Sequence, residues 1–143
     1  MYRTSYVRRG VGALLCAAPL LLLGSSIVRA VTSGDRHGTP GLTVILVAIG
    51  IGALNFYLSF IRGLSFRRTR GSLENYKHVS GIPLVGTVLV VVGAVLGFGS
   101  ALCAGLGLLA VALDTGGSVW FLIATWKDSS LWDRPRDQKL GTA

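Results

Sequence analysis

The chain has 143 residues, of which 51% are hydrophobic, 14% are charged and 20 in number are glycine. These values are typical of a membrane protein, and the length fits one domain, residues 1–143. The formal net charge of +8 would suit a nucleic-acid partner. However, the Lys and Arg residues lie in short blocks beside apolar runs and form no basic stripe interleaved with aromatics. We therefore exclude nucleic acid and expect the lipid bilayer as the main partner.

The first apolar run follows three arginines in the first ten residues. We expect a helix over about residues 11–31, kinked at Pro19 because proline removes a backbone donor and clashes with the preceding turn. The alternative is a secretory signal peptide cleaved after Val28-Arg29-Ala30. The run exceeds the roughly 7–15 residues usual in a signal, and further apolar segments follow. We therefore expect the helix to stay attached.

The second apolar run predicts a helix over about residues 42–61 that ends beside Phe56, Tyr57 and Phe60, an aromatic belt at a membrane interface. A polar loop, residues 62–80, follows it. This loop carries five basic residues: Arg62, Arg67, Arg68, Arg70 and Lys77. They are candidates for contact with anionic lipid at the cytoplasmic face. The alternative is that these charges only orient the protein in the membrane.

Residues 82–126 contain one charged side chain, Asp114. A membrane span takes about 20 residues, so this length predicts two helices, 82–102 and 106–126, with a turn near Cys103-Ala104-Gly105. The tail, residues 127–143, is expected to be a short cytoplasmic extension, largely unordered beyond Trp132.

The distribution of basic residues predicts the orientation. Three Lys or Arg lie in residues 1–10, five in residues 62–80 and four in the tail, against two, Arg29 and Arg36, elsewhere. The positive-inside rule then places both termini and the middle loop in the cytoplasm. The predicted fold is an all-α, four-helix transmembrane bundle built from two helical hairpins, in the bacterial inner membrane.

Asp114, with Thr115 beside it, is the main candidate polar site. A carboxyl inside a membrane is costly, and it marks either an ion or proton site or a hydrogen-bonded packing group. In an ion site, burial would favour protonation, and the Gly116-Gly117 pair would free backbone carbonyls as ligands. In the packing interpretation, which we favour, Asn55 of the second helix is the expected partner. A turn at residues 114–118 is a third alternative, but it would require a helix of about 32 residues before it and would leave only about eight after it, which fits a membrane span badly.

A stripe of small residues at four-residue spacing is the second candidate feature: Gly93, Gly97, Ala101 and Gly105. Small residues at this spacing let helix backbones approach closely. We expect the stripe to pack within the molecule, and a homodimer face is the alternative.

No pattern predicts an enzyme, a cofactor or a metal. Asp114-Thr115-Gly116 matches the D-T-G of aspartic proteases, but those enzymes need two carboxylates that share a proton, and the chain has one copy. Cys16 and Cys103 are expected to be free thiols, too far apart for a disulfide. The sequence therefore favours a small structural or interaction protein, such as an immunity or accessory protein. The alternative is a proton- or cation-coupled transporter subunit that uses Asp114.

Overall fold

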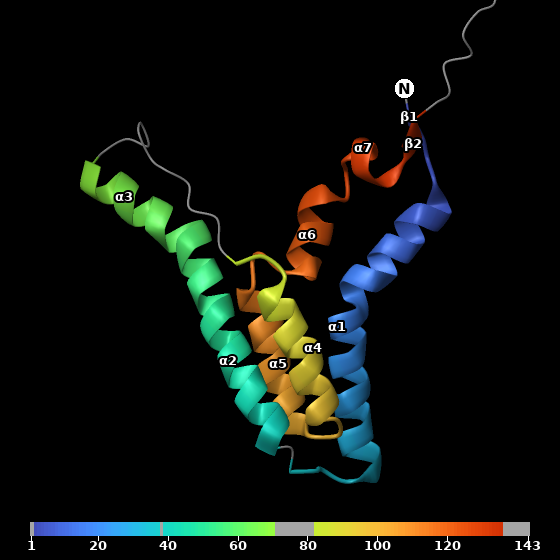
Figure 1. Cartoon of the computed structure of the whole chain (residues 1–143), viewed down its shortest axis with the longest axis vertical. Coiled ribbons are helices and arrows are strands. Elements are labelled where there is room, and N and C mark those ends of the chain that lie inside the picture. The colour runs from blue at the N-terminus through green and yellow to red at the C-terminus, as the bar shows by residue number, and fades with distance from the viewer. Residues whose placement is uncertain (1, 38, 71–81, 136–143) are drawn as a thin grey trace, which may run out of the picture.

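The computed structural model describes residues 2–37, 39–70 and 82–135, and these form helices joined by short turns (Figure 1). The chain order is β1 (Tyr2–Arg3), α1 (Tyr6–Ser33), α2 (Thr39–Phe56), the π-helix η1 (Tyr57–Ile61), α3 (Arg62–Arg70), α4 (Val85–Leu96), α5 (Ala101–Leu113), α6 (Ser118–Thr125), α7 (Ser129–Trp132) and β2 (Arg134–Pro135). The predicted all-helical class is confirmed, apart from one antiparallel pair of two-residue strands, β1 and β2.

Two helices are long and apolar enough to cross a membrane: Tyr6–Ser33, and the continuous helix Pro40–Thr69 that comprises most of α2, η1 and α3. The pair α5 and α6 passes the same test as one broken span, bent by 43° between residues 113 and 118. The apolar helix α4 has 12 residues, about 18 Å at 1.5 Å per residue, which is shorter than the hydrocarbon core of a bilayer.

Small side chains dominate the packed interior, where α2, α4 and α5 lie together and α1 covers α4 and α5 (Figure 1). One face of α2 is buried, and its members alternate in steps of four and three: Gly41, Ile45, Ala48, Gly52 and Asn55. Large apolar side chains such as Leu14, Val88 and Ile123 point outward and are more than half exposed. This inverted pattern is what lipid-facing helices show, because tight backbone contact replaces hydrophobic burial as the source of packing.

The turn between the third and fourth predicted helices lies earlier than expected. The prediction at Cys103–Gly105 is wrong: residues 97–100 form the turn, and Cys103 lies in the first turn of α5. Gly99 adopts a positive φ of 86°, which glycine tolerates best. The Ser100 hydroxyl then caps α5 by accepting a hydrogen bond from the backbone N–H of Cys103 at 3.4 Å. A glycine followed by a capping serine was the signal for this turn.

The prediction of one continuous helix over residues 106–126 is also wrong. Helix α5 ends at Leu113, residues 114–117 form a turn, and α6 begins at Ser118. A turn here had been disfavoured because it seemed to require a very long helix before it. The turn at residues 97–100 removes that difficulty by dividing the preceding stretch.

The second helix is longer than predicted, because residues 62–70 continue it as α3 instead of beginning a loop. This segment contains no proline, so nothing in its backbone chemistry stops the helix. The remainder of the predicted loop, residues 71–80, lies outside the described residues. Helix α1 contains Pro19 and bends along its length (Figure 1).

The C-terminal segment is more ordered than predicted as far as Pro135. Asp133 pairs with Arg9 of α1, with Nη2 and Oδ2 2.7 Å apart, and its Oδ1 accepts from Arg9 Nε at 2.8 Å. The Arg9 guanidinium also lies over the Trp126 ring, 5.4 Å from its centroid. Both ends of the described chain are therefore held at one end of α1.

Candidate functional site

Asp114 is 2% exposed and lies where two helices are interrupted. Its backbone caps the end of α5, and its side chain faces the first turn of α4. Carboxylate Oδ1 accepts a hydrogen bond from Asn55 Nδ2 at 2.7 Å, and Oδ2 accepts from Thr87 Oγ1 at 3.3 Å. The structure thus brings together Asp114 and Asn55, as the packing interpretation expected.

Asn55 is equally buried, at 1% exposure, and it binds backbone as well as Asp114. Its Oδ1 accepts from the Ile82 N–H at 2.9 Å, and its Nδ2 donates to the Ile82 carbonyl at 3.1 Å. Residues 82–84 are not helical, so these peptide groups have no helical partner. Asn55 therefore satisfies both polar groups of Ile82, which would otherwise cost several kcal/mol in a bilayer.

Hydrogen bonds between interrupted segments extend this network. The Leu84 N–H donates to the Gly116 carbonyl at 3.1 Å. Thr87 Oγ1 accepts from the Ser118 N–H, at the start of α6, at 3.2 Å. We call Asn55, Thr87 and Asp114, with the backbone of Ile82 and Ser118, the polar cluster. The ends of helices leave backbone groups without hydrogen-bond partners inside the helix. Here the start of α4 and the break between α5 and α6 supply these partners to each other.

Three glycines leave room for the polar cluster. A Cβ on Gly86 would collide with the Asp114 carboxyl, and one on Gly117 would lie 2.6 Å from Thr87 Oγ1. A Cβ on Gly116 would lie 3.2 Å from the Pro83 Cα. The absence of side chains at these positions lets α4 approach the break closely.

Thr115, the third predicted member of the site, does not reach Asp114's partners. Its Oγ1 lies 2.8 Å from Ser59 Oγ of η1, an exposed contact on the same side of the break. The π-helix η1 begins two residues after Asn55, and such segments often occur at functional sites. Here η1 also carries Phe60, whose ring centroid is 6.3 Å from that of Trp120 in α6.

Sequence reasoning missed Gly86, Thr87 and the backbone of Ile82. Thr87 offered a signal, because it is the one hydroxyl residue in the apolar segment 85–96. Gly86 and Ile82 offered none, since their importance comes from what other segments bring against them.

The glycine stripe divides at the turn into two halves with different surroundings. Gly93 and Gly97 are buried, and a Cβ on Gly41 of α2 would lie 2.6 Å from both the Gly93 carbonyl oxygen and the Gly97 Cα. Ala101 and Gly105 are exposed, and nothing lies within 4 Å of a Cβ built on Gly105. The continuous stripe is therefore not a single packing face. On α5 the buried small positions are Ala104, Gly107 and Ala110.

The predicted lipid-contact residues fall on α3 and beyond it. Arg67 and Arg68 are exposed, Arg62 is partly buried where α3 begins, and Arg70 ends the helix. Lys77 lies outside the described residues. Lipid contact by these side chains stays a prediction.

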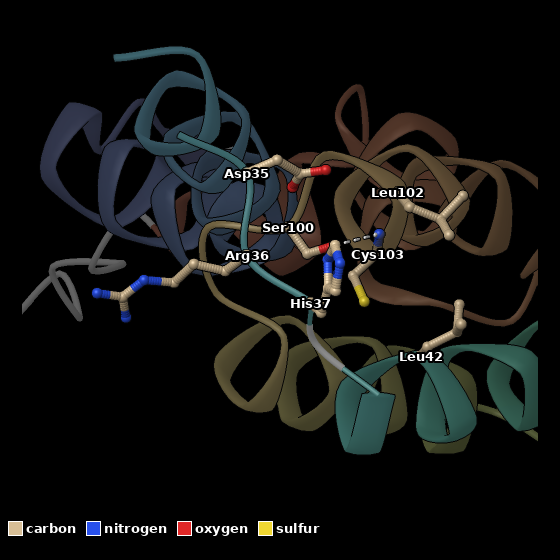
Figure 2. A pocket seen from close by; sticks show the side chains of 7 residues that line it. All are labelled: Asp35, Arg36, His37, Leu42, Ser100, Leu102 and Cys103. Carbon is tan, nitrogen blue, oxygen red and sulfur yellow. Dashed lines mark hydrogen bonds between the residues drawn. The ribbon is translucent and has the colours of Figure 1, made fainter. Parts of the chain in front are cut away.

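A cavity of about 330 Å³ lies at the opposite end of the bundle, near the turn at residues 97–100. Figure 2 shows its lining, which consists of Asp35, Arg36, His37, Leu42, Ser100, Leu102 and Cys103. The loop that forms one wall is held by Asp35 Oδ1, which accepts from the Ala101 N–H at 2.9 Å. Cys103 and Cys16 form no disulfide, as expected. Among the described residues, no group of three or more His, Cys, Asp or Glu side chains is arranged to hold a metal.

No protein-family model, curated protein or solved structure matches this chain. The fold and the site by themselves define a class: a helical protein with two candidate membrane-spanning helices, or three when the bent pair is counted as one span.

Proposed function

We propose that this chain is a small multi-pass protein of the bacterial inner membrane that works by helix packing, with itself or with a membrane partner, and has no enzymatic activity. The observation that carries this proposal is that the side chains of the polar cluster bind groups of the chain itself. The side chains of Asn55 and Thr87 bind the chain's own backbone at Ile82 and Ser118. Polar groups used in this way hold interrupted helices together.

The proposed topology has four crossings with both termini in the cytoplasm. Arg9 lies at one end of α1 beside Trp126, while Arg29 and Arg36 lie at the other end around Gly99. The basic α3 helix ends at the same side as Arg9 (Figure 1). This charge asymmetry supports the orientation. In the third crossing, α4 covers part of the bilayer and the non-helical residues 82–84 continue it, with their backbone satisfied by the polar cluster.

The first helix belongs to the mature protein in this proposal. Leu23 of α1 is fully buried in the core, and Ser26 accepts a hydrogen bond from the Gly99 N–H at 2.9 Å. Cleavage after Ala30 would remove both contacts as well as Arg9.

The proposed partners of this protein are the bilayer, a second copy of the chain or another membrane protein. Gly93 and Gly97 are already used in packing against Gly41, so a partner helix would meet the exposed small residues Ala101 and Gly105 instead. An immunity or accessory protein would have this size and these exposed faces.

One observation favours a transporter subunit as the second candidate. A carboxyl lies at a 43° break between two apolar helices, and interrupted helices form the substrate and ion sites of many transporters. In this alternative Asp114 exchanges a proton or cation, and residues 114–117 act as the hinge.

Proton flux separates the two candidates. The purified chain is reconstituted in liposomes, and flux is followed with an entrapped pH-sensitive dye, for wild type and Asp114→Asn. Our proposal predicts background flux for both. Flux in the wild type that disappears in a well-folded Asp114→Asn variant would establish the transporter instead.

Reporter fusions test the topology separately. A fusion after Gly34 should report the outer side, and fusions after Arg70 and Lys139 should report the cytoplasm. Export of the Arg70 fusion would contradict the proposed orientation.

A further inference from the structure

A second cavity, of about 320 Å³, lies at the arginine-rich end of α1. We call it the α1 groove, and it is lined by Arg8, Val11, Gly12, Leu15, Phe121, Leu131 and Trp132. The α1 residues of the groove lie on one face of the helix. Val11 and Gly12 follow Arg8 by one turn, and Leu15 follows it by two turns. The groove is thus an apolar channel with a cation at its end.

Trp132 forms the buried wall of the α1 groove. Its Nε1 donates to the Thr125 carbonyl at 2.7 Å, which satisfies the polar end of the indole. The ring lies against Gly12, where an added Cβ would collide with it. It also packs near Phe121, with ring centroids 6.3 Å apart. The wall is therefore fixed and apolar.

The charge of Arg8 is not neutralised within the described residues. The nearby acids are engaged elsewhere: Asp133 pairs with Arg9, and Asp128 accepts from Ser130. Arg8 is exposed and forms no salt bridge in the part of the chain that the structure describes. Its guanidinium is therefore available to a phosphate, which arginine binds in bidentate geometry.

We propose that the α1 groove binds an anionic phospholipid, with its phosphate on Arg8 and an acyl chain along Val11, Leu15 and Phe121. The occupant follows from position and charge. Apolar side chains exposed at the level of a membrane span meet acyl chains, and the basic end meets the headgroup layer, where anionic lipid concentrates. This site is separate from α3 and its arginines. The inference rests on the proposed membrane location but not on the proposed orientation.

Lipid titration of the full-length purified chain tests the site. Native mass spectrometry in a neutral detergent would count bound phosphatidylglycerol and phosphatidylcholine as each is added. We expect wild type to prefer phosphatidylglycerol by about fivefold, the effect of one basic residue at an anionic surface. Arg8→Gln should remove that preference, and Arg8→Lys should keep most of it. Arg36→Gln, which changes an exposed arginine in the loop after α1, at the other end of that helix, is the matched control and should leave it unchanged.

Filling the groove tests the acyl-chain part. Val11 is 53% exposed, so Val11→Phe should occupy the groove without disturbing the core and should weaken binding of both lipids. Val28→Phe, at the far end of the same helix, is the control because Val28 is also exposed. Equal losses in Arg8→Gln and Arg36→Gln, or equal losses in the two phenylalanine variants, would overturn the site. Because both lipids are added to micelles, the result does not depend on which way the chain faces in a cell.

Discussion

Replacement of Asn55 by leucine should destabilise the protein more than replacement of Asp114 by leucine. This ranking reverses the one that charge alone suggests. Leucine has the same branched skeleton of heavy atoms as asparagine, so the change mainly removes hydrogen bonds. In Asn55→Leu the N–H and the C=O of Ile82 both lose their partner, and the Asp114 carboxyl loses its 2.7 Å bond.

The magnitude follows from counting the groups left without a partner. Each buried polar group that loses its bond costs about 1–3 kcal/mol. Two backbone groups therefore give about 2–6 kcal/mol for Asn55→Leu. In Asp114→Leu, Asn55 Nδ2 keeps the Ile82 carbonyl and Thr87 Oγ1 keeps the Ser118 N–H. That change leaves the backbone groups paired and removes two hydrogen bonds between side chains. At about 0.6 kcal/mol for each interhelical bond, it should cost only about 1 kcal/mol.

The assay is equilibrium unfolding of the purified protein in mixed micelles, followed by tryptophan fluorescence. Ser59→Ala is the control, because it removes an exposed hydroxyl contact one turn along the same helix. Asp114→Asn should stay within about 1 kcal/mol of wild type, since the amide can accept from Asn55 and donate to Thr87. If Asp114→Leu proves as costly as Asn55→Leu, or Asn55→Leu matches wild type, the backbone role of Asn55 is refuted.

Two further predictions concern packing and pH. Gly97→Leu should unfold or strongly destabilise the bundle, because a side chain there has no room beside Cys103 and Gly41. Gly105→Leu should be tolerated, and a thermal-stability measurement compares the two variants. Equal effects would contradict the division of the stripe. The pKa of Asp133 is lowered from 3.8 to about 2, chiefly by the hydrogen bond from Arg9. The folded-state pKa lies below the unfolded value, so the docking of this segment is fully stabilised above about pH 4 and weakens as pH falls toward 2. Tryptophan fluorescence, to which Trp126 and Trp132 beside this ion pair contribute, should report that loss in wild type and a smaller change in Asp133→Asn; identical pH profiles would refute it.

The sequence by itself determined the all-helical class and the apolar segments long enough to span a membrane, because long apolar runs bounded by arginines have few other solutions. It also identified Asp114 and Asn55 as partners, since intramembrane polar side chains are rare and must find one another. Local chemistry could in addition have located the turn at residues 97–100, where Gly99 precedes a capping serine.

Tertiary structure decided where the helices are interrupted, which glycines are packed and where the α1 groove lies. The reason is that each of these features is formed by residues far apart in the chain. Helix α5 ends at Leu113 because the break that follows it is completed by α4 and Asn55, which are distant in sequence. Gly86 matters only because a carboxyl lies against it, and Gly97 differs from Gly105 only in having other residues packed against it. The α1 groove likewise exists because Trp132 returns to Gly12. Hydrophobic periodicity reports which segments are helical, but the position of an interruption depends on which segment supplies the missing hydrogen bonds.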